Sequence, residues 1–231
     1  MQTFDGMLLV DKPAGWSSFK VVAVVRRILS EQAGHKIKVG HAGTLDPFAT
    51  GLLIILVGKA CKEADRFLKL DKTYEATAIL GQQSTTGDPE GEISEVSSWE
   101  PSDAEIQTAL QQFRGEVTQT PPIYSAIKVG GVRAYQLARK GKEVKIQPRQ
   151  VTVYQLTKVS YAYPELTLRC AVSSGTYIRS LVEDIGNALG VGAYTTALRR
   201  THIAAWKVTD ALQMAAENPS AEEIVARLQP T

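Results

Sequence analysis

The chain has 231 residues, of which 44% are hydrophobic and 22% are charged, and its formal net charge is +2. This composition is typical of a globular protein, and one large domain with an insertion is the simplest organisation for this length. No apolar run is long enough to span a bilayer, and residues 1–5 do not begin a signal peptide. Cys61 and Cys170 lack metal-like spacing. We therefore expect a cytoplasmic protein with two buried thiols rather than a disulfide.

The charges are unevenly distributed along the chain. Residues 71–120 contain two basic and ten acidic side chains, whereas residues 121–207 contain thirteen basic and four acidic ones. A positive surface of this kind attracts a polyanion, and it suits nucleic acid better than a small neutral metabolite. The alternative is that these charges are solvated at loop tips.

Hydrophobic periodicity predicts alternating strands and helices in the first half of the chain. In chain order we expect a strand at 7–10, a turn at 11–15, a helix at 19–29, a basic loop at 34–38, a buried strand at 52–57, a short helix at 62–70, an alternating strand at 73–80 and a helix after the capping box Ser102-x-x-Glu105. The acidic loop 82–98 between the last two elements carries no pattern to which we assign chemistry.

The second half of the chain is predicted by the same rules. Strands are expected at 151–159 and 165–172, a helix from 178 to 189 after the turn at 173–176, a final strand at 204–208 and a closing helix at 220–228. Residues 208–231 form a short tail.

Residues 40–53 contain one carboxylate, Asp46, among three glycines and directly before Pro47. Glycine permits close backbone approaches, and a proline biases the preceding residue toward extended geometry, so the carboxylate should be held by a stiff loop that enters the buried strand. The alternative is a tight turn in which the aspartate caps its own backbone.

The segment 121–150 is rich in cations and contains Tyr124 beside a Gly130-Gly131 turn. Its basic side chains are Lys128, Arg133, Arg139, Lys140, Lys142, Lys145 and Arg149, and Glu143 is the only acid among them. Basic and aromatic residues together are what an RNA-gripping surface needs. We expect this segment to project from the core.

Two further residues have both a functional and a structural interpretation. Arg179 falls in the first turn of a helix, where a cation opposes the helix dipole at a cost of roughly 0.3–1 kcal/mol, so a carboxylate partner is expected. Glu183, one turn later, is the local candidate. Tyr74 points to the core side of its strand, where an aromatic residue usually only packs.

Four motifs in this order resemble the TruB family of tRNA pseudouridine synthases. They are Lys12-Pro13, residues 40–47 around Asp46, Lys72-Thr73-Tyr74-Glu75-Ala76 and residues 175–181 around Arg179. The resemblance extends over about residues 7–206 and implies a mixed, largely antiparallel sheet flanked by helices, with 121–150 as a basic thumb. It further implies isomerisation of uridine 55 in the T loop of tRNA without cofactor or metal. The family's usual C-terminal PUA domain does not fit in the short tail, so we expect a single catalytic domain over 1–231.

The resemblance also implies roles for individual residues. Asp46 would attack C1′ or C6, or remove the C2′ proton, with Arg179 as its ionic partner and Tyr74 stacked on the flipped base. His41 would order the flipped-out loop, or serve only as a hydrogen-bonded loop histidine. The remaining predicted substrate-binding residues are Tyr177, Lys12, Lys128, Arg133, Lys140 and Lys142, with Lys12 bracing the site.

Three other functions compete with this interpretation. The first is a non-catalytic tRNA-binding or folding helper on the same frame. The second is an aspartyl-phosphate hydrolase built on Asp46, which lacks a second nearby acid for magnesium and a glycine-rich phosphate cradle. The third keeps the isomerisation but applies it to ribosomal or messenger RNA. We expect a monomer that binds the T stem-loop of tRNA and no membrane.

Overall fold

The computed structural model describes residues 4–214 and 218–231, except 126, 139 and 143. Its chain divides into two compact units, the first formed by residues 1–74 with 198–231 and the second by residues 75–197. Whether these units form one domain stays a prediction. Among the described residues, none of the helices is both long and apolar enough to cross a lipid bilayer.

The strands of the first unit are ordered around β3. Strand β1 (Gly6–Lys12) runs antiparallel to β3 (Thr50–Val57) from Gly6↔Val57 to Lys12↔Gly51. On the other edge of β3, β2 (Val39–Ala42) pairs antiparallel and β12 (Ala193–Ile203) pairs parallel. Strand β14 (Leu212–Gln213) extends β1, and β13 (Trp206–Lys207) extends β12.

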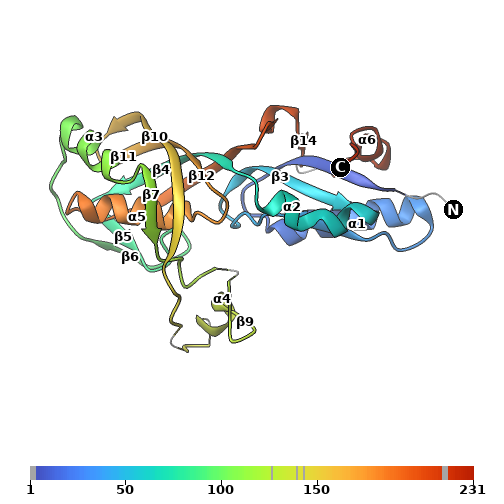
Figure 1. The fold of residues 1–231 in the computed structure, drawn as a ribbon, viewed down its shortest axis with the longest axis horizontal. Helices are drawn as coiled ribbons and strands as arrows, with labels where there is room; N and C mark the ends of the chain where they lie inside the picture. The colour runs from blue at the N-terminus through green and yellow to red at the C-terminus, as the bar shows by residue number, and fades with distance from the viewer. Residues whose placement is uncertain (1–3, 126, 139, 143, 215–217) are drawn as a thin grey trace. The chain divides into compact units, whose positions relative to one another are not determined.

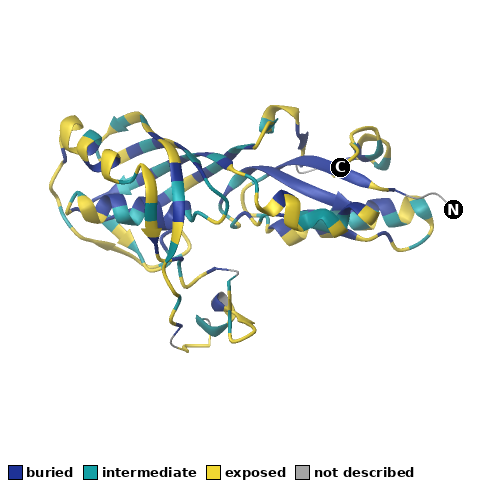
Figure 2. Ribbon diagram, in the orientation of Figure 1, coloured by how far each residue is buried: buried dark blue, intermediate teal, exposed yellow. Residues whose placement is uncertain are grey.

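The packing of β3 explains why its sequence contains an unbroken apolar run. Its odd residues, such as Leu53 and Ile55, pack in a cluster with the apolar face of helix α1 (Ser18–Ala33). Its even residues, such as Ile54, pack in a second cluster with Phe67 of α2 (Ala64–Leu68). Successive strand residues point to opposite faces, so both faces must be apolar when both are covered. Figure 2 shows β1 and β3 as continuously buried.

Helices at the edges of the first unit have clear end signals. Ser17 caps α1 by accepting a hydrogen bond from the Lys20 N–H at 3.1 Å, and Gly34 ends it in the left-handed conformation. Ser220 and Glu223 form a capping box on α6 (Ala221–Ala226), whose Ile224 joins the α1 cluster. The 3₁₀ turns η1 (Gly58–Glu63) and η2 (Val208–Asp210) complete this unit.

The second unit contains the rest of the sheet, against which helices α3 and α5 lie. Its strand order is β12-β4-β11-β10-β7, where the new strands are β4 (Lys72–Leu80), β7 (Gly115–Gln119), β10 (Arg149–Ala162) and β11 (Glu165–Val172). Helix α3 (Asp103–Gln112) packs against β10 and against helix α5 (Ile178–Ala188). Figure 1 shows α5 lying along these strands.

Two excursions leave this part of the sheet. The acidic loop contains a small hairpin of β5 (Gln82–Ser84) and β6 (Ile93–Glu95). The basic segment 121–150 contains a second hairpin of β8 (Lys128–Val129) and β9 (Val132–Arg133), followed by α4 (Ala134–Ala138). Figure 1 shows α4 and β9 projecting away from β7 and β10, and Figure 2 shows that this segment is largely exposed.

The predicted mixed, largely antiparallel sheet flanked by helices is confirmed. The strand expected at 204–208 is shortened to the two-residue β13, because a tight turn with Ala204 at φ 47° separates it from β12, and it is not the final strand, because β14 follows. The sequence did not predict β12. The helix expected at 62–70 is shortened to α2 because its first residues belong to the 3₁₀ turn. Neither cysteine forms a disulfide, as expected, but only Cys170 is buried, whereas Cys61 is half-buried.

Candidate functional site

The loop that carries Asp46 is held to the start of α1 through its backbone. The Ser18 hydroxyl donates to the Leu45 carbonyl at 3.1 Å and accepts from the Leu45 N–H at 2.9 Å. The Gly15 N–H donates to the Pro47 carbonyl at 2.8 Å. The residues on both sides of Asp46 are therefore fixed by neighbours that lie about thirty positions earlier in the chain. Asp46 itself is partly buried.

Lys12 braces the same loop from inside. Its side chain is fully buried, and its ammonium donates to the carbonyls of Pro13 at 2.9 Å, Trp16 at 2.6 Å and Pro47 at 3.3 Å. Burial lowers the pKa of Lys12 to about 8, while the nearby Asp46 carboxylate acts in the opposite direction and raises it. These contacts support the bracing role expected for Lys12. Direct contact with RNA stays a prediction.

Arg200 supports the loop from β12, and the sequence analysis assigned it no role. Its Nε donates to the Leu52 carbonyl at 2.6 Å and its Nη2 to the Gly43 carbonyl at 3.0 Å, while only 1% of the residue is exposed. Gly51 has φ 104°, and a Cβ there would lie 2.3 Å from the Arg200 carbonyl oxygen. A glycine at 51 is therefore required for the parallel pairing of β12 with β3.

Tyr74 and His41 lie on strands of the first unit. Tyr74 is buried, with 8% of the residue exposed, and it occupies one of the buried alternate positions of β4. His41 is half-buried in β2, where it pairs with Ile55. The position of Tyr74 agrees with the predicted strand, whereas His41, which was expected in a loop, lies in β2. Neither one by itself distinguishes a functional side chain from a packed one.

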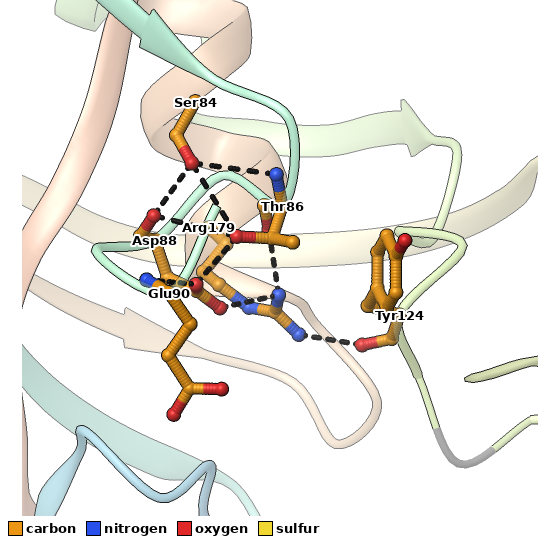
Figure 3. A network of polar contacts seen from close by, with 6 residues as sticks. All are labelled: Ser84, Thr86, Asp88, Glu90, Tyr124 and Arg179. Carbon is orange, nitrogen blue, oxygen red and sulfur yellow. Dashed lines mark hydrogen bonds and ion pairs between the residues drawn. The ribbon is translucent and has the colours of Figure 1, made fainter. Parts of the chain in front are cut away.

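Arg179 is the centre of a buried polar network in the second unit, which Figure 3 shows. Only 3% of the residue is exposed. Its Nη1 donates to the Asp88 carboxylate at 2.8 Å and to the Thr86 carbonyl at 2.7 Å, and its Nη2 donates to the Tyr124 carbonyl at 2.8 Å. The carboxylate partner expected for this cation therefore includes Asp88. The predicted pairing with Asp46, which belongs to the other unit, stays a prediction.

Asp88 is the site residue that sequence reasoning missed. Its Oδ1 accepts from the Thr86 hydroxyl at 2.6 Å and from the Glu90 N–H at 3.0 Å, and its backbone carbonyl accepts from the Ser84 hydroxyl at 2.6 Å. The acidic loop is thus organised around this residue. A signal was present, because Gly87-Asp88-Pro89 repeats the arrangement of an aspartate before a proline in a glycine-containing loop that directed attention to Asp46.

Glu183 lies beside this network rather than at the exposed surface. A Cβ added to Gly87 would come within 2.2 Å of the Glu183 carboxylate, so the loop backbone packs directly against it. Burial raises the pKa of Glu183 to about 7. The Arg179 cation opposes this rise, and the Asp184 and Asp88 carboxylates add to it.

The remaining predicted residues lie at or near the basic segment. Tyr177 is the N-cap residue of α5, and the Arg149 guanidinium lies over its ring at 5.1 Å from the centroid. Lys128, Arg133, Lys140 and Lys142 are exposed, and Arg139 lies outside the described residues. Four exposed cations on a projecting segment form a positive surface suited to phosphate groups. Among the described residues, no cluster of histidine, cysteine and carboxylate side chains forms a candidate metal site.

Comparisons with known proteins match the whole chain. The N-terminal domain of TruB family pseudouridylate synthases matches residues 26–178, and the C-terminal domain of tRNA pseudouridylate synthase B matches residues 179–230. A tRNA pseudouridine synthase B of Opitutus terrae is 44% identical over 98% of this chain and 92% of its own. That of Burkholderia mallei is 43% identical over 99% of this chain and 74% of its own.

Solved structures agree with these matches. A crystal structure of a Cbf5-Nop10-Gar1 complex has a TM-score of 0.69 at 30% identity and covers 90% of this chain and 52% of that chain. A structure of an H/ACA RNP bound to a substrate RNA containing 2′-deoxyuridine has a TM-score of 0.66 at 28% identity over 90% of this chain and 51% of that chain. This chain therefore spans about half of each of those chains.

The mixed sheet with its flanking helices therefore has the same fold as the matching part of those structures. The chain belongs to the TruB family of pseudouridylate synthases. The resemblance found from the four motifs is thereby confirmed.

Replacing Asp88 by asparagine should strongly destabilise the second unit. The change keeps the shape of the side chain but leaves the buried Arg179 cation without this carboxylate, and breaking a buried pair in this way costs about 3–5 kcal/mol. Urea unfolding measures the loss. The matched control is Asp103→Asn, which removes an exposed ion pair with Lys158 and should cost less than about 1 kcal/mol. Equal effects of the two variants would contradict a buried role for Asp88.

The raised pKa of Glu183 predicts a pH-dependent effect of Glu183→Gln. Between about pH 4.5 and pH 7 the native state keeps a proton that the unfolded state has released, so the wild-type free energy of unfolding falls as pH rises. The variant lacks this loss. Its free energy of unfolding, relative to that of the wild type, should therefore rise by about 1–2 kcal/mol between pH 4.5 and pH 8, after allowance for solvent screening. Urea unfolding across this range tests it, with the exposed Glu92→Gln as control. A constant difference between variant and wild type would contradict the prediction.

Proposed function

We propose that this protein isomerises uridine 55 in the T loop of tRNA to pseudouridine, with Asp46 as the catalytic carboxylate. As a member of the TruB family, it is a tRNA pseudouridine synthase. The observation that carries the assignment of Asp46 is that its loop is fixed by Ser18, Lys12 and Arg200 through backbone contacts. A preorganised carboxylate is what this reaction asks of the protein.

The reaction breaks the N1–C1′ bond of uridine, turns the base and joins C5 to C1′. The proton at C5 is lost and N1 gains one, so the reaction is an isomerisation without a redox step. The enzyme must take the nucleotide out of its stack and keep the detached base in a pocket. The Asp46 carboxylate serves as the nucleophile toward C1′ or C6, or as the base that removes the C2′ proton.

We assign the supporting roles to residues on both units. Asp46 must be ionised to act as nucleophile or base, and a neighbouring guanidinium stabilises the ionised form in a dry pocket, which is the role proposed for Arg179. Tyr74 stacks on the target base and assists removal of the C5 proton. His41 orders the flipped-out RNA loop, and Tyr177 supports Arg179 from the preceding turn.

The basic segment 121–150 is proposed to grip the T stem-loop. Its exposed residues Lys128, Arg133, Lys140 and Lys142 neutralise phosphates, and the counterions released on binding make the affinity depend steeply on salt. We further propose that the protein acts in the cytoplasm as a monomer. Membership of a family of synthases does not favour a non-catalytic tRNA-binding helper.

Asp46→Asn should abolish pseudouridine formation while leaving tRNA affinity within about threefold. The amide keeps the shape of the side chain but cannot act as nucleophile or base at neutral pH. Single-turnover conversion of a T stem-loop RNA and equilibrium binding of the same RNA measure the two effects. Asp71→Asn, an exposed position in the same unit, is the control. Appreciable conversion by the Asp46 variant would remove its catalytic role.

Neutralising Lys128, Lys140 and Lys142 together should weaken RNA binding and flatten its salt dependence. Each lost phosphate contact lowers the slope of log K against log salt by about 0.7 to 0.9. Binding titrations at salt concentrations between about 50 and 200 mM measure the change in slope. The control neutralises three exposed lysines elsewhere, Lys59, Lys62 and Lys69. An unchanged slope in the first variant would contradict the gripping role of the segment.

A further inference from the structure

Gln119, the last residue of β7, makes a two-way hydrogen bond with the backbone at the start of α5. Only 1% of this residue is exposed. Its Oε1 accepts from the Tyr177 N–H at 2.7 Å, and its Nε2 donates to the Tyr177 carbonyl at 3.0 Å. A buried side-chain amide that satisfies both a donor and an acceptor of one residue fixes the position of that backbone unit.

The residue that Gln119 holds is the N-cap of α5. The Tyr177 side chain makes no capping hydrogen bond, although its carbonyl accepts the first helical bond from the Leu181 N–H at 3.1 Å. Gln119 therefore accepts from the N-cap N–H, as the N3 side chain of a capping box ordinarily does, but it does so from strand β7. Arg179 follows two residues later, in the first turn. Gln119 thus holds the backbone two residues before the one from which the Arg179 side chain extends.

The chain on both sides of the basic segment contacts this same turn. After Gln119, the Thr120 carbonyl accepts from the Ser180 hydroxyl at 3.1 Å, and the Tyr124 carbonyl accepts from Arg179. At the other end, Arg149 pairs with Gln119 in the β7–β10 register and donates to the Gly175 carbonyl. The entry and the exit of the basic segment are therefore both bonded to residues 175–180.

We propose that Gln119 is a positioning residue for Arg179. Its two hydrogen bonds to Tyr177, called the clamp below, hold the start of α5, to which both Arg179 and the basic segment are attached. This inference rests on the proposed role of Arg179. The clamp requires a donor and an acceptor at a fixed spacing. An ionised glutamate offers only acceptors, a leucine offers neither, and an asparagine is one methylene too short to keep both bonds.

Two variants of the full chain test the clamp. Gln119→Leu removes both bonds, and we expect kcat for a T stem-loop RNA to fall about 10- to 100-fold, the effect of a misplacement near 1 Å, with RNA affinity within threefold. The matched control is Gln155→Leu on the neighbouring strand β10, where the side chain is exposed, and it should leave kcat unchanged. Thermal unfolding of each variant reports whether the protein is folded.

Gln119→Glu provides a second readout that a merely structural role would not move. A protonated carboxyl offers one donor and one acceptor and restores the clamp, whereas the ionised form places a second acceptor against the Tyr177 carbonyl. The charged groups on the elements that contact this position include Arg149, which pairs with residue 119 in the β7–β10 register, and Arg179 and Glu183 on α5. We expect kcat of this variant, relative to the wild type, to fall at least fivefold between pH 5.5 and pH 8, while the leucine variant keeps a constant ratio.

The outcomes separate the clamp from the proposed function. The clamp is overturned if the wild type is active and the folded leucine variant has an unchanged kcat. It is also overturned if the leucine variant loses only RNA affinity. If the leucine variant does not fold, the pH series of the glutamate variant decides, and a constant ratio to the wild type overturns the clamp. Wild-type protein that forms no pseudouridine overturns the proposed function and, with it, the role of Gln119 in catalysis.

Discussion

The buried Arg179 cation needs an ionic partner and hydrogen bonds, and this requirement organises much of the second unit. Burying a charge is costly unless it is both ion-paired and hydrogen-bonded, so every segment that supplies a partner is fixed in place by that need. The Asp88 carboxylate and the Thr86 carbonyl come from the acidic loop, and the Tyr124 carbonyl comes from the entry to the basic segment. One cation therefore locates three stretches of chain that are far apart in sequence. The cost of placing a cation in the first turn of a helix is offset in the same way.

The Asp46 loop is held by a different kind of contact. Ser18, Lys12 and Arg200 all direct the hydrogen bonds described above to backbone atoms of the loop or of its neighbours. These bonds to backbone atoms fix the path of the loop, and none of them uses the Asp46 carboxylate as a partner. The fixed loop and the network around Arg179 thus represent two solutions to one problem, that of holding a charged side chain in a defined direction within a folded protein.

The basic segment differs from both, because its function depends on exposure. Lys128 and Arg133 lie on the two-residue strands β8 and β9, and Lys140 and Lys142 lie in the loop after α4. All four are exposed, so their charges are available to a polyanion. Its two ends are nevertheless anchored at the start of α5. The surface proposed to bind RNA is in this way attached to a rigid support, which is common where binding residues lie on loops.

The sequence by itself determined the features that depend on neighbours along the chain. Periodicity placed β3, β4, α1 and α5, the capping box at Ser102 marked the start of α3, and four motifs, including the one around Asp46, indicated the family. Only the tertiary structure revealed Asp88, Arg200 and Gln119 as partners of Arg179, Gly43 and Tyr177, because these bonds join residues 91, 157 and 58 positions apart. Local propensities act over a few residues, whereas the pairing of a buried polar group is decided by whichever segment the fold brings to it.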